Sequence, residues 1–244
     1  TRLRTVTGVQ TCALPILEPN FARVIDGSSD DRGLSCTTDS NGNVYLSGYY
    51  TGTPKIYTQS GYTLLGLPTS NATTSTAAFV CKFDSSGNHV FSRIVDSNSS
   101  EQGLGVTCDS SGNVYIAGYY TGTPIIYDQA GTSLGTLPAS SGAGSTAFVC
   151  KFDSSGNYQY SRIVDSSGAN DQGVVACDSS GNMYLAGFYV ATATPTIKDE
   201  GGNPLGTLPT FGGGGSYVAF VSKFDSSGAY KYSRVVDGSS TSEQ

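Results

Sequence analysis

The chain of 244 residues contains no tryptophan, one histidine and one methionine, and charged residues make up 13% of it. His89 is the single histidine, so it is the one residue that could serve in a Ser-His-Asp triad or a Cys-His pair, and a histidine-rich zinc site is excluded. No segment approaches the roughly 20 apolar residues that a transmembrane helix needs. The sequence therefore predicts a protein that is not an enzyme and has no membrane span.

Positive charge is also scarce. The formal net charge is −6 and the pI is near 4.6, which argues against nucleic acid or an anionic membrane as a partner. The hydrophobic fraction of 37%, with 11% aromatic residues, is enough for a packed β core and too high for a disordered chain.

What the chain has in abundance is internal repetition. Near-identical segments (RVID, RIVD, RIVD, RVVD) recur at intervals of 70, 69 and 72 residues and contain Arg23, Arg93, Arg162 and Arg234. The distance from each of the first three arginines to the next turn glycine is always 19 residues, whereas a later stretch of each repeat varies in length. Insertions are tolerated in surface loops and rejected where strand register is fixed, so the constant stretches predict sheet.

The second repeat shows how each unit is built. Residues 103–109 and 113–120 are rich in β-branched and aromatic residues and flank a Ser-Ser-Gly turn, which predicts a hairpin. Residues 146–153 and 157–164 repeat the construction, with Asp153 placed to bond the turn amides. Between these two hairpins, residues 124–138 predict a third, decorating hairpin of variable sequence. Its counterparts span residues 54–66 and 195–208.

Two core hairpins make a four-stranded antiparallel unit that cannot bury its own faces, so the units must stack. We expect an all-β fold, a β-propeller-like array of three four-stranded antiparallel blades, each with an inserted hairpin, forming an open arc or part of a larger ring. The expected parts are a closing strand of a preceding blade plus connector at 17–31, blades at 32–96, 103–165 and 172–237, and the truncated start of another blade at 238–244.

Two segments of this repeat, CDSSGNVYIAGYY (108–120) and AFVCKFDSSGNYQYSRIV (147–164), resemble the SBBP-type β-propeller repeat. The chain departs from that family where Phe91, Tyr160 and Tyr232 replace a common tryptophan. The resemblance implies the propeller fold. It also implies a large secreted or surface protein, usually without an assigned activity, and hence a scaffold or binding role.

Both ends of the chain are expected to be truncated. Residues 6–16 (VTGVQTCALPI) are similar to a translated sequencing-library adapter, so residues 1–16 are expected to be a non-native artefact. The C-terminus stops where another blade would continue. We therefore expect a fragment of a longer protein.

Five cysteines remain outside that artefact. Cys81 and Cys150 are equivalent, as are Cys108 and Cys177, and both steps between the classes are 27 residues. This pattern suits two equivalent disulfides joining consecutive units in an oxidising compartment. Buried free thiols are the alternative.

The repeated basic residues and the histidine have simpler interpretations. Each arginine is expected to pair with a nearby carboxylate such as Asp96 or Asp165 at the blade edge, with an anion-binding ring as the alternative. His89 lies just past a hairpin turn, at a position filled freely in the other repeats, and is expected to be exposed.

Acidic residues recur between the blades and in the first turn of each blade, and they are weak candidates for calcium ligands. They are Asp31, Glu101 and Asp171, with Asp39, Asp109 and Asp178 seven or eight residues further on. Hairpin-turn chemistry is the alternative explanation for the turn aspartates. No other cofactor is expected.

The function that these patterns favour is a non-catalytic structural or protein-interaction scaffold, a propeller segment of a larger extracellular or cell-surface repeat protein. Its expected partners are other blades of the same or a neighbouring chain. One alternative is a glycan- or calcium-dependent binding module that uses the variable hairpins. Another is a fragment of a propeller enzyme whose active site lies in missing blades.

Overall fold

The computed structural model describes residues 21–71, 75–142, 144–166, 171–211 and 217–236, and these residues form strands joined by turns and loops. The predicted all-β fold of antiparallel sheets is confirmed. The expectations for residues 1–16 and 238–244 lie outside the described residues. In the part of the chain that the structure describes, no helix is long and apolar enough to cross a membrane.

Each repeat contributes four strands to one sheet. The first unit consists of β2 (Arg32–Thr38), β3 (Val44–Tyr50), β6 (Ala77–Phe83) and β7 (His89–Asp96). The second consists of β8 (Glu101–Cys108), β9 (Val114–Tyr120), β12 (Thr146–Phe152) and β13 (Tyr158–Asp165). The third consists of β14 (Gln172–Cys177), β15 (Met183–Val190), β18 (Tyr217–Phe224) and β19 (Tyr230–Val236). In all three, neighbouring strands pair in antiparallel fashion.

The inserted hairpins do not decorate their own units as expected. They are β4 (Lys55–Thr58) with β5 (Thr63–Gly66), β10 (Ile125–Asp128) with β11 (Ser133–Thr136), and β16 (Thr196–Asp199) with β17 (Pro204–Thr207). Each hairpin extends the sheet of the preceding unit: β10 pairs with β7, β16 with β13, and β4 with β1 (Arg23–Asp26). The first two units therefore lie in six-stranded sheets, because an outer strand presents unpaired backbone groups that the next hairpin satisfies.

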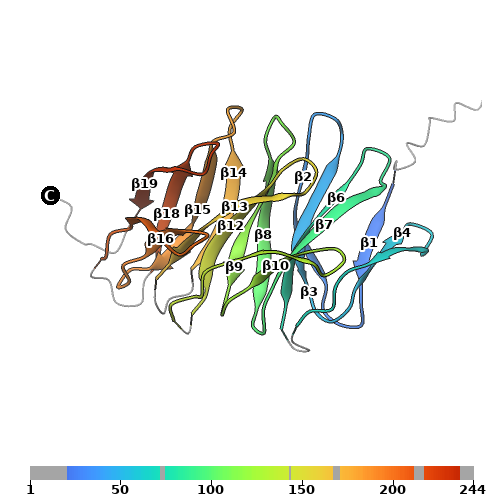
Figure 1. Cartoon of the computed structure of the whole chain (residues 1–244), viewed down its shortest axis with the longest axis horizontal. Coiled ribbons are helices and arrows are strands. Elements are labelled where there is room, and N and C mark those ends of the chain that lie inside the picture. The colour runs from blue at the N-terminus through green and yellow to red at the C-terminus, as the bar shows by residue number, and fades with distance from the viewer. Residues whose placement is uncertain (1–20, 72–74, 143, 167–170, 212–216, 237–244) are drawn as a thin grey trace, which may run out of the picture.

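The sheets lie side by side along the long axis of the molecule (Figure 1). The first strands of the units, β2, β8 and β14, contact one another in succession. Hydrophobic clusters fill the space between neighbouring sheets. One joins Tyr45, Val80 and Phe91 of the first unit to Ile116 and Phe148 of the second. This face-to-face burial is what stacked blades require, and no closed ring is formed by the described residues.

Three glycines bring the first strand of each unit close to the second. A Cβ atom on Gly118 would lie 1.7 Å from the carbonyl oxygen of Gln102, and Gly48 and Gly187 have the same relation to Arg32 and Gln172 at 1.8 Å. Only glycine allows this backbone approach.

The first strand of the third unit differs from its counterparts. In the first two units a bulge places Leu34 or Leu104 out of register, whereas β14 pairs with β15 without a bulge. The constant 19-residue spacing therefore does not mean a constant register. Compared with the first unit, a connector that is one residue longer offsets a first strand that is one residue shorter.

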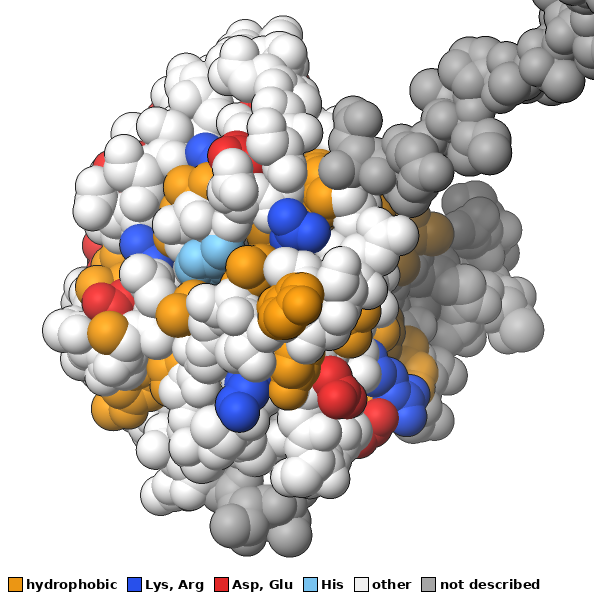
Figure 2. All heavy atoms as spheres, turned by 90° about the vertical axis from the view of Figure 1, so that its right-hand side faces the viewer, with side chains coloured by type: hydrophobic (Ala, Val, Ile, Leu, Met, Phe, Trp, Pro, Cys, Tyr) orange, Lys and Arg blue, Asp and Glu red, His pale blue; other side chains and the backbone are white. Residues whose placement is uncertain are grey.

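Among the described residues, no further sheet covers the outer face at either end of the array. Figure 2 looks at the end formed by β1, β4 and β5, where separate hydrophobic areas lie among polar and charged side chains. At this end Tyr62 is 75% exposed and Val24 is 50% exposed. At the other end β19 has no hairpin beside it among the described residues, and Val236 is 75% exposed.

Candidate functional site

The turn aspartates organise the first hairpin of every unit. In the second unit Asp109 Oδ1 accepts hydrogen bonds from the amides of Ser111 and Asn113, and its Oδ2 accepts from the side chains of Asn113 and Tyr115. Asp39 and Asp178 repeat these contacts. Hydrogen bonds, the largest from Asn182, hold the pKa of Asp178 below its usual range. The structure thus uses these carboxylates to fix the turns.

The repeated lysines tie neighbouring units together. Lys82 Nζ donates to the carbonyl oxygen of Ser154 in the next unit at 2.9 Å, and Lys151 Nζ donates to Ser226 in the same way. Each ammonium also lies over two aromatic rings, those of Tyr115 and Tyr160 in the case of Lys151. Both lysines are buried, so their charge is held by carbonyl and ring interactions instead of water.

The repeated arginines reach the same turns. Arg93 Nε donates to the carbonyl oxygen of Gly156 at 2.6 Å, and Arg162 Nε donates to Gly228 at 2.7 Å. The expected pairing with Asp96 or Asp165 is wrong. Arg162 pairs instead with Glu200 on the inserted hairpin of the next unit. The reason is direction: the arginine side chain extends toward the neighbouring sheet, whereas the two aspartates close the ends of their own strands.

The connector carboxylates of the second and third units are buried, and that of the first is partly buried. Glu101 is fully buried and accepts hydrogen bonds from the amide and the hydroxyl of Ser97 at 3.1 and 2.6 Å. Asp171 is also fully buried and accepts from the Ser166 hydroxyl at 2.8 Å. Burial raises the pKa of Glu101 to about 8 and that of Asp171 to about 7. Burial raises the pKa of Asp31 as well, so the direction of the shift is the same at all three positions.

The six calcium candidates therefore fall into two separate sets. Asp39, Asp109 and Asp178 lie in turns, and Asp31, Glu101 and Asp171 lie in connectors. Within the described ranges no three Asp, Glu, His or Cys side chains gather closely enough to hold a metal ion. Calcium stays a prediction that rests on the sequence.

The cysteines are free thiols in the described structure, and neither of the two suggested disulfides is present. Cys81 and Cys150 are fully buried within β6 and β12. Cys108 and Cys177 end the first strands of their units, where the Cys177 thiol donates to the carbonyl oxygen of Cys108 at 2.9 Å. The neighbour of Cys177 is therefore the backbone of Cys108, which the sequence pattern did not suggest.

His89 is half-buried and does not have the exposure expected for it. Its Nε2 lies 2.8 Å from the Ser92 hydroxyl, which lies 3.1 Å from the Cys81 thiol. This chain of groups was not apparent from the sequence, because the three residues come from two strands. Burial lowers the pKa of His89 and raises that of Cys81 to about 12, the opposite of thiol activation.

The equivalent positions in the other units show what this chain of groups does. Tyr158 donates to Ser161 in the second unit, and Tyr230 donates to Ser233 in the third, both at 3.0 Å. Because a tyrosine takes the position of His89 in the other two units, the contact to the strand serine does not depend on an imidazole.

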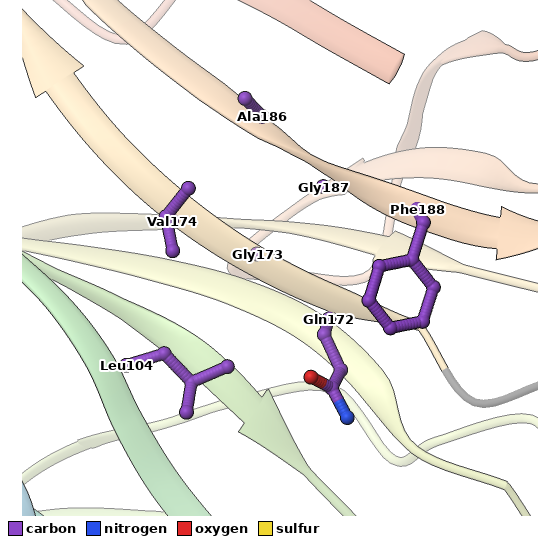
Figure 3. A pocket seen from close by; sticks show the side chains of 7 residues that line it. All are labelled: Leu104, Gln172, Gly173, Val174, Ala186, Gly187 and Phe188. Carbon is purple, nitrogen blue, oxygen red and sulfur yellow. The ribbon is translucent and has the colours of Figure 1, made fainter. Parts of the chain in front are cut away.

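Two surface hollows lie between the second and third units. A polar one of about 370 Å³ lies among their turns, next to Lys151 and five serines, Ser110, Ser111, Ser179, Ser180 and Ser226. An apolar one of about 150 Å³ is lined by Leu104, Val174, Phe188 and their neighbours (Figure 3). It lies beside the bulge-free start of β14. Ligand pockets measure about 300–1,000 Å³, so only the polar hollow reaches that size.

Comparison with known proteins supports the fold. The chain is 25% identical to the uncharacterized WD repeat-containing protein L264 of Acanthamoeba polyphaga mimivirus, over 69% of this chain and 13% of that protein. No family model matches the chain, so the resemblance to SBBP-type repeats stays a prediction. WD repeats form four-stranded propeller blades. The antiparallel sheets stacked in series agree with the blades of such a propeller, to which the chain is thus similar in fold.

Proposed function

We propose that the chain is a non-catalytic structural and protein-interaction scaffold, a segment of a larger SBBP-like propeller protein that is secreted or displayed on a surface. The observation that carries the proposal is the way in which units join. At each junction between described units, a hairpin extends the preceding sheet, and a lysine and an arginine donate to turn carbonyls of the next unit.

The third unit has an outer strand and a repeated arginine of the same kind, but the described residues include no following hairpin or turn for them to contact. No hairpin lies beside β19, and Arg234 Nη1 donates only to the carbonyl oxygen of Ser233 next to it in sequence. Arg234 is exposed, whereas Arg162 is 8% exposed. Val236 and Tyr232 are 75% and 41% exposed. This surface suits a further unit of the same kind, from the same polypeptide or another copy.

Light scattering coupled to size-exclusion chromatography tests this proposal. At micromolar concentration the chain should show a mass above that of the monomer which falls on dilution. Val236→Glu should shift the equilibrium toward monomer by at least about tenfold, because a carboxylate would be buried at the junction. Val90→Glu, at a position 45% exposed on β7, is the matched control and should leave the mass unchanged. A clean monomer at these concentrations would contradict the proposal.

A second candidate function follows from the polar hollow between the turns of units two and three. Its serine hydroxyls and the Lys151 ammonium are groups that bind sugar hydroxyls. A glycan-binding module would be retained on a glycan array, and Ser180→Val would abolish that retention. Repeating the array with calcium and with a chelator separates the calcium-dependent version. No retention under either condition would remove this candidate.

The remaining alternative, a propeller enzyme with its active site in other blades, depends on sequence that flanks this chain, as does the proposed extracellular location. Recovery of the full reading frame tests both. A catalytic domain on the same frame would favour the enzyme, and a secretion signal would favour the surface protein.

A further inference from the structure

A small hollow of about 170 Å³ lies where the second unit's hairpin meets the first unit. Its walls are Pro68, Thr69 and Asn71 from the loop of the first unit, Asp96 at the end of β7, and Tyr127 and Gly131 from the β10–β11 hairpin. The hollow is therefore created by the interlock between units.

Asp96 is the charged group in the wall of this hollow. The residue is 3% exposed, and its Oδ2 accepts a 2.8 Å hydrogen bond from the amide of Asn71. Its Oδ1 is buried and has no hydrogen-bond partner among the described residues. Burial raises the pKa of Asp96 to about 6. A buried carboxylate with an unsatisfied oxygen is costly unless a cation or a donor reaches it.

In the second unit, side chains of the same chain satisfy the equivalent carboxylate. Asp165 occupies the equivalent position, and Lys198 from the next hairpin places its ammonium 2.6 Å from Asp165 Oδ2. Thr146 donates to Oδ1 at 3.1 Å. Although burial alone would raise the pKa of Asp165, hydrogen bonds from Lys198 and Ser141 bring it below the usual value.

Two residue differences remove those partners from the first unit. The register of β10 against β7 places Tyr127 opposite Ile94, where β16 places Lys198 opposite Ile163. The register of β6 against β3 places Ala77 opposite Tyr50, where β12 places Thr146 opposite Tyr120. The hollow of the first unit therefore keeps the carboxylate, lacks the ammonium, and gains an aromatic wall that favours a cation.

We propose that the hollow at Asp96, here called the Asp96 pocket, binds a primary alkylammonium group, either the end of a partner's lysine side chain or a free alkylamine. Its volume is below the range of pockets for larger ligands and suits a chain end with a few methylenes. This inference goes beyond the scaffold function, and its test is independent of self-association.

The test titrates the full chain with n-butylammonium and with Nα-acetyl-lysine amide, and follows the resonances around the pocket by NMR. The neutral controls are 1-butanol and Nα-acetyl-norleucine amide. We expect dissociation constants on the order of millimolar for the two cations, because the ligands are small, and at least tenfold weaker binding of the neutral controls. Asp96→Asn should weaken binding of both cations at least tenfold.

A second pair of variants keeps the test decisive if Asp96→Asn does not fold. Tyr127→Lys supplies the ammonium from within, so it should block binding and raise the melting temperature above that of Tyr127→Met, which has a similar length and no charge. If the lysine amide binds more tightly than n-butylammonium, the site recognises a protein lysine; if it binds equally or more weakly, the site recognises a free alkylamine. Cations that bind no better than the neutral controls, or variants at Tyr127 that melt alike, would overturn the proposal.

Discussion

The Nε of Arg93 donates a 2.6 Å hydrogen bond to the backbone carbonyl of Gly156, which lies 63 residues further along the chain. Arg23 and Arg162 make the same bond to Gly87 and Gly228. The guanidinium of Arg93 also lies 4.8 Å from the centre of the Phe91 ring. The arginine that marks the repeat in sequence therefore acts between units, and it holds the turn of the next unit in place.

Replacing such an arginine should weaken the array where a neighbour is present. Arg162→Met should lower the free energy of unfolding by about 2–4 kcal/mol, because the buried guanidinium's hydrogen bonds to the Gly228 turn carbonyl, the Ser161 carbonyl and the Glu200 carboxylate are lost. Urea denaturation measures the change. Arg234→Met is the matched control at the exposed equivalent position and should have little effect. Equal losses in the two variants would mean that the contact between units does not matter.

The close approach of the first two strands makes a glycine indispensable. Gly118→Ala would place a methyl group 1.7 Å from the Gln102 carbonyl oxygen, so the variant should lose more than about 3 kcal/mol of stability or fail to fold. Gly66→Ala, where no atom lies within 4 Å of the new methyl group, should change stability by less than about 0.5 kcal/mol. Thermal melting of the purified variants compares them. A Gly118→Ala variant as stable as Gly66→Ala would show that the strands lie further apart.

The connector acids predict that stability falls as pH rises. The pKa of Glu101 is raised from 4.5 to about 8 in the folded protein, so the fold holds a proton that the unfolded chain releases. The resulting contribution is complete below about pH 4.5 and is lost as pH rises through about 8, at about 1.4 kcal/mol per pH unit.

The neutral variant Glu101→Gln should lack this dependence. It should be similar to the wild type at pH 4 and more stable at pH 8, as measured by urea denaturation across the range. A difference between the two proteins that does not change with pH would show that Glu101 is ionised in the fold.

The open edge of β19 should accept a hairpin supplied in trans. A synthetic peptide of residues 195–209, which contains β16 and β17, should bind the chain and compete with its self-association. Fluorescence anisotropy of the labelled peptide measures binding, and a scrambled peptide is the control. Val236→Glu should weaken binding of the peptide. Equal binding of the scrambled peptide would show that the edge does not select a hairpin.

Much of the fold could be predicted from the sequence, because local signals specify hairpins. The Asp-Ser-Ser-Gly turns, the alternation around them and the 70-residue interval predict the four strands of each unit. The partner of the inserted hairpin could not be predicted in this way. A short strand has the same pattern of hydrophobic residues whether it extends the sheet of its own unit or that of the preceding unit. The choice between the two sheets depends on which one has an unpaired edge strand, such as β7.

The contacts that define the site were harder to foresee for the same reason. Arg162 is three residues from Asp165, which favoured a local pair, but the structure directs it to Gly228. The constant spacing likewise concealed the missing bulge in β14. The sequence does show that the second repeat has Tyr127 at the position equivalent to Lys198 of the third. The importance of this difference for Asp96 can be recognised only when the register of the two hairpins is known.

Amide hydrogen exchange, measured by mass spectrometry at a concentration where the chain is monomeric, tests most directly whether each unit's outer edge is completed by the next unit's hairpin. The account predicts that the outward-facing amides of residues 162–165 in β13 and those of residues 125–128 in β10 are protected. Their counterparts at residues 234–236 in β19 should exchange rapidly. Equal protection of β13 and β19, with free exchange in β10, would mean that the hairpins only decorate the array and would contradict the account.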